Sequence, residues 1–233
     1  MIKKLRRFIA GNKTSQTKNT YYIELIETFD REECVICKLL KSTTEKYLEN
    51  LLHEFTMDPV SRKEIRLAYG YCAKHTAQLI EVTKNTNQRL SASIVAQDLA
   101  NYVLKQCGRS LNSRARAGID VFKKRESCPI CKYYTKHEKM YISEFSKGSV
   151  KEEFMYKFIE KPGICIEHLI KVSRSIRDMA ALKRLLKTQV EIIGAIDLEL
   201  NNFVKKFDHK SNEKIIDGEA SAWIRLFDRI NST

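Results

Sequence analysis

Glycine and proline are scarce in this chain, with 8 and 3 among its 233 residues. Average usage, about 7% and 5%, would supply more than twice as many. A β-sandwich or a glycine-rich nucleotide-binding fold needs more turn-forming residues than this. A disordered chain would carry fewer apolar residues than the 43% found here. The scarcity therefore excludes those classes and favours an all-α fold with long helices and few loops.

Long apolar runs are also absent. No segment approaches the roughly 20 apolar residues that a membrane-spanning helix needs. The first ten residues, MIKKLRRFIA, are basic, but the polar stretch GNKTSQ follows them, so the hydrophobic part of a secretion signal is missing. We therefore expect a cytoplasmic protein without a transmembrane segment. In that compartment thiols stay reduced, and clustered cysteines bind metal more often than they form disulfides.

Six of the seven cysteines and two of the five histidines follow one repeated pattern, in which CxxC precedes CxxH by 33 or 34 intervening residues. The first copy holds Cys34, Cys37, Cys72 and His75, and the second holds Cys128, Cys131, Cys165 and His168. The segments LANYVLK at 99–105 and LNNFVKK at 200–206 are a later similarity between the two copies. This spacing predicts an internal duplication, with two tandem zinc-stapled helical bundles.

Three sulfurs and one imidazole are a ligand set that suits tetrahedral Zn²⁺. Because the protein fills all four positions, no water remains to be activated, so the pattern predicts two structural zinc sites. A thioredoxin-type redox pair would need a neighbouring strand, and an iron–sulfur cluster normally uses four cysteines. Similar loop lengths favour closure within each copy. Pairing of Cys34 and Cys37 with Cys165 and His168 is the alternative that spacing leaves open.

Apolar residues at three-to-four spacing predict the helices. Asp58 and Pro59 indicate the start of a short helix that ends near Gly70. The next helical segment runs from 73 to 107, with Gly108 as its C-terminal cap and Cys107 as a buried apolar residue. The last long helix is expected over about 165–207, and a short closing helix follows it around Trp223.

The segments outside the repeats carry most of the positive charge. We divide the chain into a basic arm (1–20), a first repeat (21–107), a basic connector (108–127), a second repeat (128–210) and a C-terminal tail (211–233). The arm has six basic residues and no acid, and the connector has six basic residues against two acids, within a formal net charge of +13. Such arms bind phosphates by releasing counterions. The candidate nucleic-acid contacts are Lys3, Lys4, Arg6, Arg7, Arg114, Arg116, Lys123, Lys124 and Arg125.

The motifs resemble a family of cytosolic bacterial and archaeal proteins that is classified as a domain of unknown function, with a duplicated CxxC…GxCxxH arrangement in a helical chain. The matching phrases are CVIC at 34–37, GYCAKH at 70–75, CPIC at 128–131 and GICIEH at 163–168, and FVKKFDHK at 203–210 is similar to the family's ending. The chain departs from the family in Val35, where proline is common, in its basic N-terminal extension, and in EKII at 213–216, where Pro-Trp-Gly is frequent. The resemblance implies a helical fold with two metal sites, and it leaves the activity open.

No catalytic constellation is evident in the sequence, which favours a non-enzymatic protein. We interpret it as a zinc-binding helical module that contacts nucleic acid or a ribonucleoprotein through its basic arms. Two alternatives remain. One is an adaptor whose long helices bind another protein. The other is a thiol and zinc switch, in which oxidation releases the metal.

Overall fold

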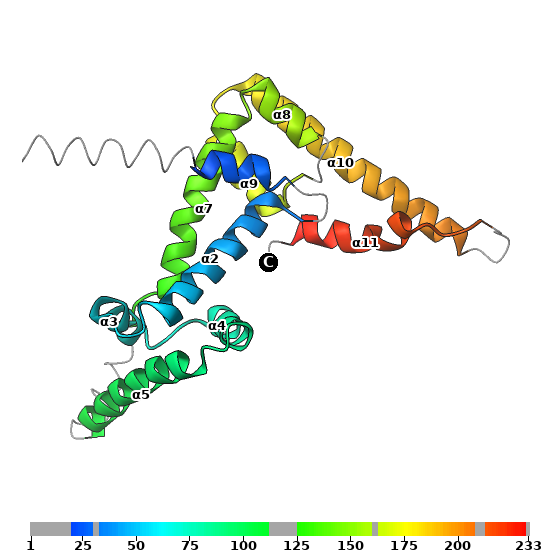
Figure 1. The fold of residues 1–233 in the computed structure, drawn as a ribbon. Coiled ribbons are helices and arrows are strands. Elements are labelled where there is room, and N and C mark those ends of the chain that lie inside the picture. The colour runs from blue at the N-terminus through cyan, green and yellow to red at the C-terminus, as the bar shows by residue number, and fades with distance from the viewer. Residues whose placement is uncertain (1–19, 30–32, 112–124, 160–162, 208–212, 232–233) are drawn as a thin grey trace, which may run out of the picture. The chain divides into compact units, whose positions relative to one another are not determined.

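The computed structural model describes residues 20–29, 33–111, 125–159, 163–207 and 213–231 (Figure 1). A helix covers 20–27. The helices after it are α2 (Val35–His53), α3 (Pro59–Leu67), α4 (Ala73–Asn85), α5 (Arg89–Leu111), α7 (Pro129–Gly148), α8 (Glu152–Ile159), α9 (Ile166–Ser175), α10 (Met179–Lys206) and α11 (Asp217–Ile230). Within these ranges there is no strand, which confirms the all-α prediction. No helix in the described part of the chain has the length and apolar character needed to cross a membrane.

The contacts divide the chain into two compact units. One unit contains the described residues up to Leu40 together with those from Glu138 onward, and the other contains the described residues of Lys41–His137. The division falls inside α2 and α7, so each of these helices contributes to both units. Each unit therefore takes residues from both of the repeats predicted at 21–107 and 128–210.

The core of the first unit contains an aromatic cluster. Phe145 of α7 and Phe154 and Phe158 of α8 are fully buried. The Phe145 ring meets the other two edge-on, with centroids 5.1 and 5.3 Å apart. Beside them, the Tyr141 hydroxyl donates to Glu24 of the 20–27 helix at 2.6 Å. Edge-to-face aromatic packing adds to the free energy of burial, so these contacts hold α7 and α8 together, and the Tyr141 hydrogen bond ties α7 to the 20–27 helix.

The core of the second unit is mainly aliphatic. Its buried members are Leu48, Leu51, Leu52, Ile65, Val82, Val95 and Ile130, and Cys128 lies in the same cluster. They come from α2, α3, α4, α5 and the start of α7. The three-to-four spacing of the leucines in α2 places them on one face, as helix periodicity requires. A cysteine of the second CxxC thus packs in a core built mostly from the first half of the chain.

Helix α3 begins as the sequence predicts. Asp58 is its N-cap, and its carboxylate accepts from the Ser61 backbone N–H at 2.7 Å. Pro59 occupies the first turn, where its missing N–H is harmless. The helix ends at Leu67, and Gly70 follows with φ of +91°, a conformation that favours glycine.

Two long helices predicted from the sequence are broken. The 73–107 segment forms α4 and α5, because Asn87 takes a left-handed conformation (φ of +55°) that ends α4. The cap predicted at Gly108 is wrong, since α5 continues to Leu111. The 165–207 segment forms α9 and α10, because the Asp178 side chain caps α10 by accepting from the N–H groups of Ala180 and Ala181.

The closing helix α11 packs along α10 (Figure 1). Lys206 near the end of α10 donates to both carboxylate oxygens of Glu219 at 2.8 Å. Arg225 of α11 also forms an ion pair with Glu199 of α10. Helix α11 also contacts α9, the helix that begins with the second CxxH. The closing helix therefore belongs to the unit in which Cys165 and His168 lie.

Candidate metal centres

The eight predicted ligands come together as two groups of four, each of which can hold a metal ion. Site 1 consists of Cys34, Cys37, Cys165 and His168, and site 2 consists of Cys72, His75, Cys128 and Cys131. Within each group the ligand atoms all lie within 4.8 Å of one another. Site 1 belongs entirely to the first compact unit and site 2 to the second.

The pairing is exchanged between the two copies of the motif. Each CxxC joins the CxxH of the other copy, so the closure within each copy that loop lengths favoured is wrong, and the alternative of crossed pairing is the one found. The loop lengths, 33 and 34 residues, could not distinguish the two arrangements because they are nearly equal. The deciding factor is tertiary: α9 packs in the unit that contains the start of α2, and α4 in the unit that contains the start of α7.

Four helix starts position the ligands. Cys34 and Cys128 immediately precede α2 and α7, and Cys37 and Cys131 lie in the first turns of those helices. The cysteines of the two CxxH motifs are the N-caps of α4 and α9, with nearly equal backbone angles: φ/ψ of −70°/164° and −68°/161°. Each histidine is then the third residue of its helix. Because backbone N–H groups and the helix dipole at an N-terminus favour negative charge, both sites suit thiolates.

The Sγ–Sγ distance at site 1 matches the edge of a zinc tetrahedron, and the Sγ–Nδ1 distances are shorter than its S–N edge by up to about 0.5 Å. Its Sγ atoms lie 3.5 Å (Cys34), 3.3 Å (Cys37) and 3.1 Å (Cys165) from Nδ1 of His168. Sγ of Cys37 and Sγ of Cys165 are 3.7 Å apart. Zinc bonds of about 2.3 Å to sulfur and 2.0–2.1 Å to nitrogen imply tetrahedral edges of about 3.8 Å and 3.6 Å. The donor set and its spacing therefore fit a four-coordinate ion.

Site 2 has the same geometry. Its sulfurs lie 3.1 Å (Cys72), 3.6 Å (Cys128) and 3.3 Å (Cys131) from Nδ1 of His75. Sγ of Cys72 and Sγ of Cys131 are 3.7 Å apart. Each distance agrees with its counterpart at site 1 within 0.1 Å. The two groups can hold the same kind of ion.

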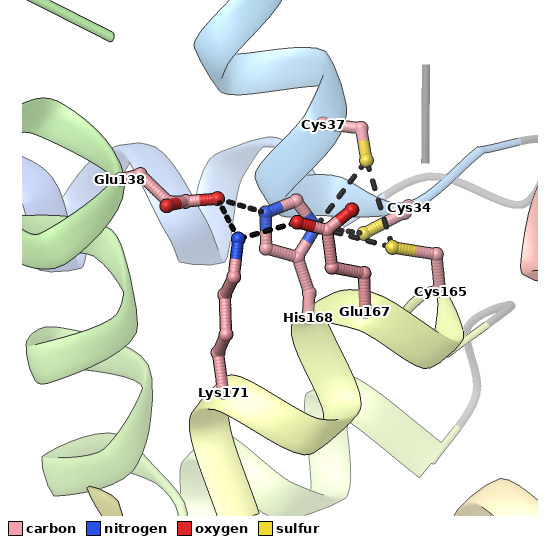
Figure 2. Close-up of polar contacts among 7 residues, drawn as sticks. All are labelled: Cys34, Cys37, Glu138, Cys165, Glu167, His168 and Lys171. Carbon is pink, nitrogen blue, oxygen red and sulfur yellow. Dashed lines mark hydrogen bonds and ion pairs between the residues drawn. The ribbon is translucent and has the colours of Figure 1, made fainter. Parts of the chain in front are cut away.

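Charged residues surround His168 (Figure 2). Its Nε2 faces Oε1 of Glu138 at 3.2 Å, and Nζ of Lys171 donates to that same oxygen at 2.8 Å. Lys171 also donates to Glu167. Hydrogen bonds with His168 lower the pKa of Glu138 even though burial opposes the shift, and the bond from Lys171 adds to the effect. A carboxylate behind a metal-binding imidazole fixes the ring and leaves the other nitrogen free to bind.

The thiols of site 1 are not equivalent without metal. Burial alone would raise the pKa of Cys34, but hydrogen bonds with Cys165, Cys37 and His168 hold it well below its ordinary value. The hydrogen bond with Cys165 instead raises the pKa of Cys37, so that this thiol keeps its proton. Without metal, the Cys34 thiol beside the His168 ring thus loses its proton more readily than the Cys37 thiol does.

A buried cation from α11 completes the surroundings of site 1. Arg229 is fully buried. Burial lowers its pKa, and the negative charge at Cys34, Asp228 and Cys165 opposes that shift. Three thiolates and one Zn²⁺ leave a net charge of −1, which a nearby guanidinium offsets.

Comparison with known proteins supports this description. The sequence profile of a family of unknown function, DUF6062, matches residues 16–232. The chain belongs to the DUF6062 family. Among its relatives is an uncharacterized 23.9 kDa protein in the xynA 3′ region of Caldicellulosiruptor sp. (strain Rt8B.4), 25% identical over 192 residues that cover 80% of this chain and 88% of the relative. No solved structure is significantly similar to the chain. The predicted family resemblance is confirmed.

Most of the remaining predicted site residues of this DUF6062 member lie outside the part of the chain that the structure describes. Of the candidate nucleic-acid contacts, Lys3, Lys4, Arg6, Arg7, Arg114, Arg116, Lys123 and Lys124 lie outside the described residues, and Arg125 is exposed. Cys107, predicted to be buried, is exposed on α5 and belongs to neither group. The preceding residue of α5, Gln106, is buried, and Cys107 lies on the side of the helix that faces solvent.

Sequence reasoning missed the residues around the ligands. Lys171 lies three residues after His168, a spacing that places both on one face of a helix, so helix periodicity could have suggested it. Glu138 and Arg229 come from α7 and α11. Only the packing of those helices against α9 reveals their relation to His168 and the sulfurs.

Proposed function

We propose that this protein binds two zinc ions, one at site 1 and one at site 2, and that the ions stabilise the fold rather than catalyse a reaction. The observation that carries the proposal is the closed donor set: three sulfurs and one Nδ1 at tetrahedral spacing, twice. Zinc prefers such ligands, and a site filled by four protein atoms leaves no position for a substrate or an activated water. Zinc would thereby cross-link helix starts that are distant in sequence.

Elemental analysis of the purified protein tests the proposal. We expect two zinc ions per chain. X-ray absorption at the zinc edge should report three sulfurs and one nitrogen around each ion. Protein that carries no metal, or that carries iron with sulfide, would contradict the proposal. Removal of zinc by a chelator should also reduce helicity and the free energy of unfolding, because binding and folding of such sites are coupled.

We further propose that this zinc-stapled module contacts nucleic acid through its basic segments. The supporting observation is the charge distribution: the arm 1–20 and the connector 108–127 together carry a net +10 of the formal +13. Arg125 is the one candidate nucleic-acid contact within the described residues. It is exposed and lies three residues before Cys128. Zinc at site 2 would therefore anchor the end of the connector.

Binding to RNA or DNA as a function of salt tests this role. Log affinity should fall steeply with log salt, since each phosphate contact releases counterions. Replacing Lys3, Lys4, Arg6 and Arg7 together with Gln should weaken binding uniformly across sequences and flatten the slope, while zinc content and helicity stay unchanged. Salt-insensitive binding, or none at about 50 mM salt, would contradict it and leave the adaptor role as the better hypothesis.

A further inference from the structure

The two sites share their ligand geometry but differ in the residues behind the ligands. Glu138 lies ten residues after the first cysteine of its CxxC, and Lys171 three residues after His168. The corresponding positions of the other copy are Thr44 and Gln78. Nζ of Lys171 donates to Glu138 at 2.8 Å, and Nε2 of Gln78 donates to Oγ1 of Thr44, also at 2.8 Å. The same two positions therefore form an ion pair near site 1 and a neutral hydrogen bond in the unit that contains site 2.

The charged pair near site 1 contacts the histidine of that site. Glu138 supports Nε2 of His168 with a carboxylate. Thr44 offers only a hydroxyl, which itself donates to the Lys41 carbonyl at 2.9 Å. A carboxylate behind the imidazole makes it a stronger ligand, and losing such a partner typically weakens metal binding by about 10–100-fold.

The sites also differ in their access to water. All four ligands of site 1 are buried, with exposed fractions of 1% (Cys34), 8% (Cys37), 0% (Cys165) and 0% (His168). At site 2, Cys72 and Cys131 are partly exposed. Thiolates that solvent can reach are the ones that chelators, alkylating agents and oxidants attack. The buried Arg229 in the unit of site 1 adds charge compensation there.

From these differences we infer that site 2 is the exchangeable, thiol-reactive metal site of this protein and that site 1 is the permanent one. The inference rests on the proposed function, since it assigns different roles to the two proposed zinc sites. Zinc leaves Cys72, His75, Cys128 and Cys131 first when a chelator or a peroxide is added. Site 1 keeps its ion under the same conditions and preserves its half of the fold.

The oxidative step involves the two partly exposed cysteines of site 2, Cys72 and Cys131. Their Sγ atoms are 3.7 Å apart. Hydrogen peroxide takes two electrons from the thiolates of Cys72 and Cys131, and with two protons it becomes two waters as the S–S bond forms. The ion loses two of its four ligands and is released. Reduction of the disulfide by an excess of thiol restores both ligands and allows zinc to bind again.

The test follows zinc release and cysteine modification in the full-length, two-zinc protein. Hydrogen peroxide or EDTA is added, released zinc is measured with a colorimetric indicator, and remaining thiols are labelled with N-ethylmaleimide and located by peptide mass spectrometry. We expect two phases of one zinc each, the first at least about tenfold faster. The labelling of Cys72 and Cys131 should change in the first phase, and that of Cys34 and Cys165 should change in the second. Exposed Cys107 should be labelled from the start.

Exchanging the residues behind the ligands between the two sites separates their effect on zinc release from the effect of cysteine exposure to solvent. Glu138→Thr with Lys171→Gln should speed release from site 1 by about 10–100-fold. Thr44→Glu with Gln78→Lys should slow release from site 2, provided that helicity shows this variant is folded. Glu153→Gln with Lys157→Gln, an exposed pair on α8 joined at 3.6 Å, is the matched control and should change neither phase.

The outcomes distinguish this inference from the proposed function. Protein purified without zinc would overturn both. Two zinc ions lost in a single phase, or lost from Cys34 and Cys165 first, would overturn the inference alone. Unchanged release from site 1 in the Glu138 and Lys171 variant would show that the ion pair does not hold the metal.

Discussion

At the scale of single residues, Gly163 sets the turn that presents Cys165. Its φ of +79° is rarely adopted by other residues, and an added Cβ would lie 2.6 Å from Oε1 of Gln189. That Gln189 amide clamps the turn: it accepts from the N–H of Ile164 at 3.2 Å and donates to the carbonyl of Ile164 at 2.8 Å. A side chain at 163 would push this clamp away from the turn.

We therefore predict that Gly163→Ala lowers the free energy of unfolding by at least about 1 kcal/mol and weakens zinc binding at site 1. Gly194→Ala is the matched control. Apart from its chain neighbours and the nearby backbone of α10 itself, no atom lies within 4 Å of its added Cβ, so this change should be neutral or stabilising by up to about 1 kcal/mol. Urea unfolding of both variants with zinc bound checks the prediction. Equal stability of the two would contradict it.

The two histidines should differ in protonation when zinc is absent. Burial acts to lower the pKa of His168, but hydrogen bonds with Cys165, Cys34 and Glu138 outweigh it and raise the pKa to about 11. The pKa of His75 is lowered instead. Nitrogen-15 spectra of the metal-free protein at pH 8 should therefore show His168 as imidazolium and His75 as neutral imidazole.

The stability of the metal-free protein follows from the sign of the His168 shift. A pKa raised on folding stabilises fully below the unfolded value, about 6.5, and the contribution is lost as the pH rises through about 11. The loss of unfolding free energy caused by His168→Asn should hence shrink as the pH is raised through this window. A His168 ring that titrates near 6.5 in the folded protein would contradict both expectations.

At the scale of helices, caps decide where the chain breaks. The segments 73–107 and 165–207 contain continuous apolar stripes, and the first has no glycine or proline to mark an interruption. Periodicity therefore predicted helix content correctly but not the ends at Asn85, Ser175 or Leu111. Asn87 and Asp178 cause the breaks through local hydrogen bonds and a left-handed backbone, and such signals are weak because the same residues also occur within helices.

We predict that Asp178→Ala destabilises the protein by about 1 kcal/mol, within the 0.5–2 kcal/mol range of lost N-caps. The reason is that Asp178 satisfies the N–H groups of Ala180 and Ala181, at 2.8 and 3.3 Å. Glu191→Ala, an exposed acid in the same helix, should change stability by only a few tenths of a kcal/mol. Thermal unfolding of both variants is the measurement. Equal effects of the two substitutions would show that the cap does not hold α10.

At the scale of the whole molecule, the exchanged pairing explains which features the sequence could predict. The ligands were predictable because CxxC and CxxH are local patterns whose geometry depends only on a turn and a helix start. Their partners were not, because the choice between Cys72 and Cys165 for the CxxC at Cys34 depends on which helices pack together. Glu138, Thr44 and Arg229 belong to the same class, since their roles arise only from tertiary contacts.

The exchange also makes the two halves of the chain depend on each other. Site 1 joins residues separated by 128 to 134 positions, and site 2 joins residues separated by 53 to 59 positions. Closing long loops costs chain entropy, which the bound metal would have to offset. Neither half of the sequence contains a complete site. Each compact unit thus needs segments from both halves of the chain.

Zinc content of paired cysteine variants tests the exchanged sites most directly. Cys34→Ser with Cys165→Ser removes two ligands of site 1 only, so the protein should keep one zinc per chain at site 2. Cys34→Ser with Cys72→Ser removes one ligand from each site, so both ions should be lost or weakly held. Pairing within each copy predicts the reverse, with one zinc kept in the second variant and zinc content reduced at both sites in the first. That reversed result would contradict the crossed arrangement of the two metal sites.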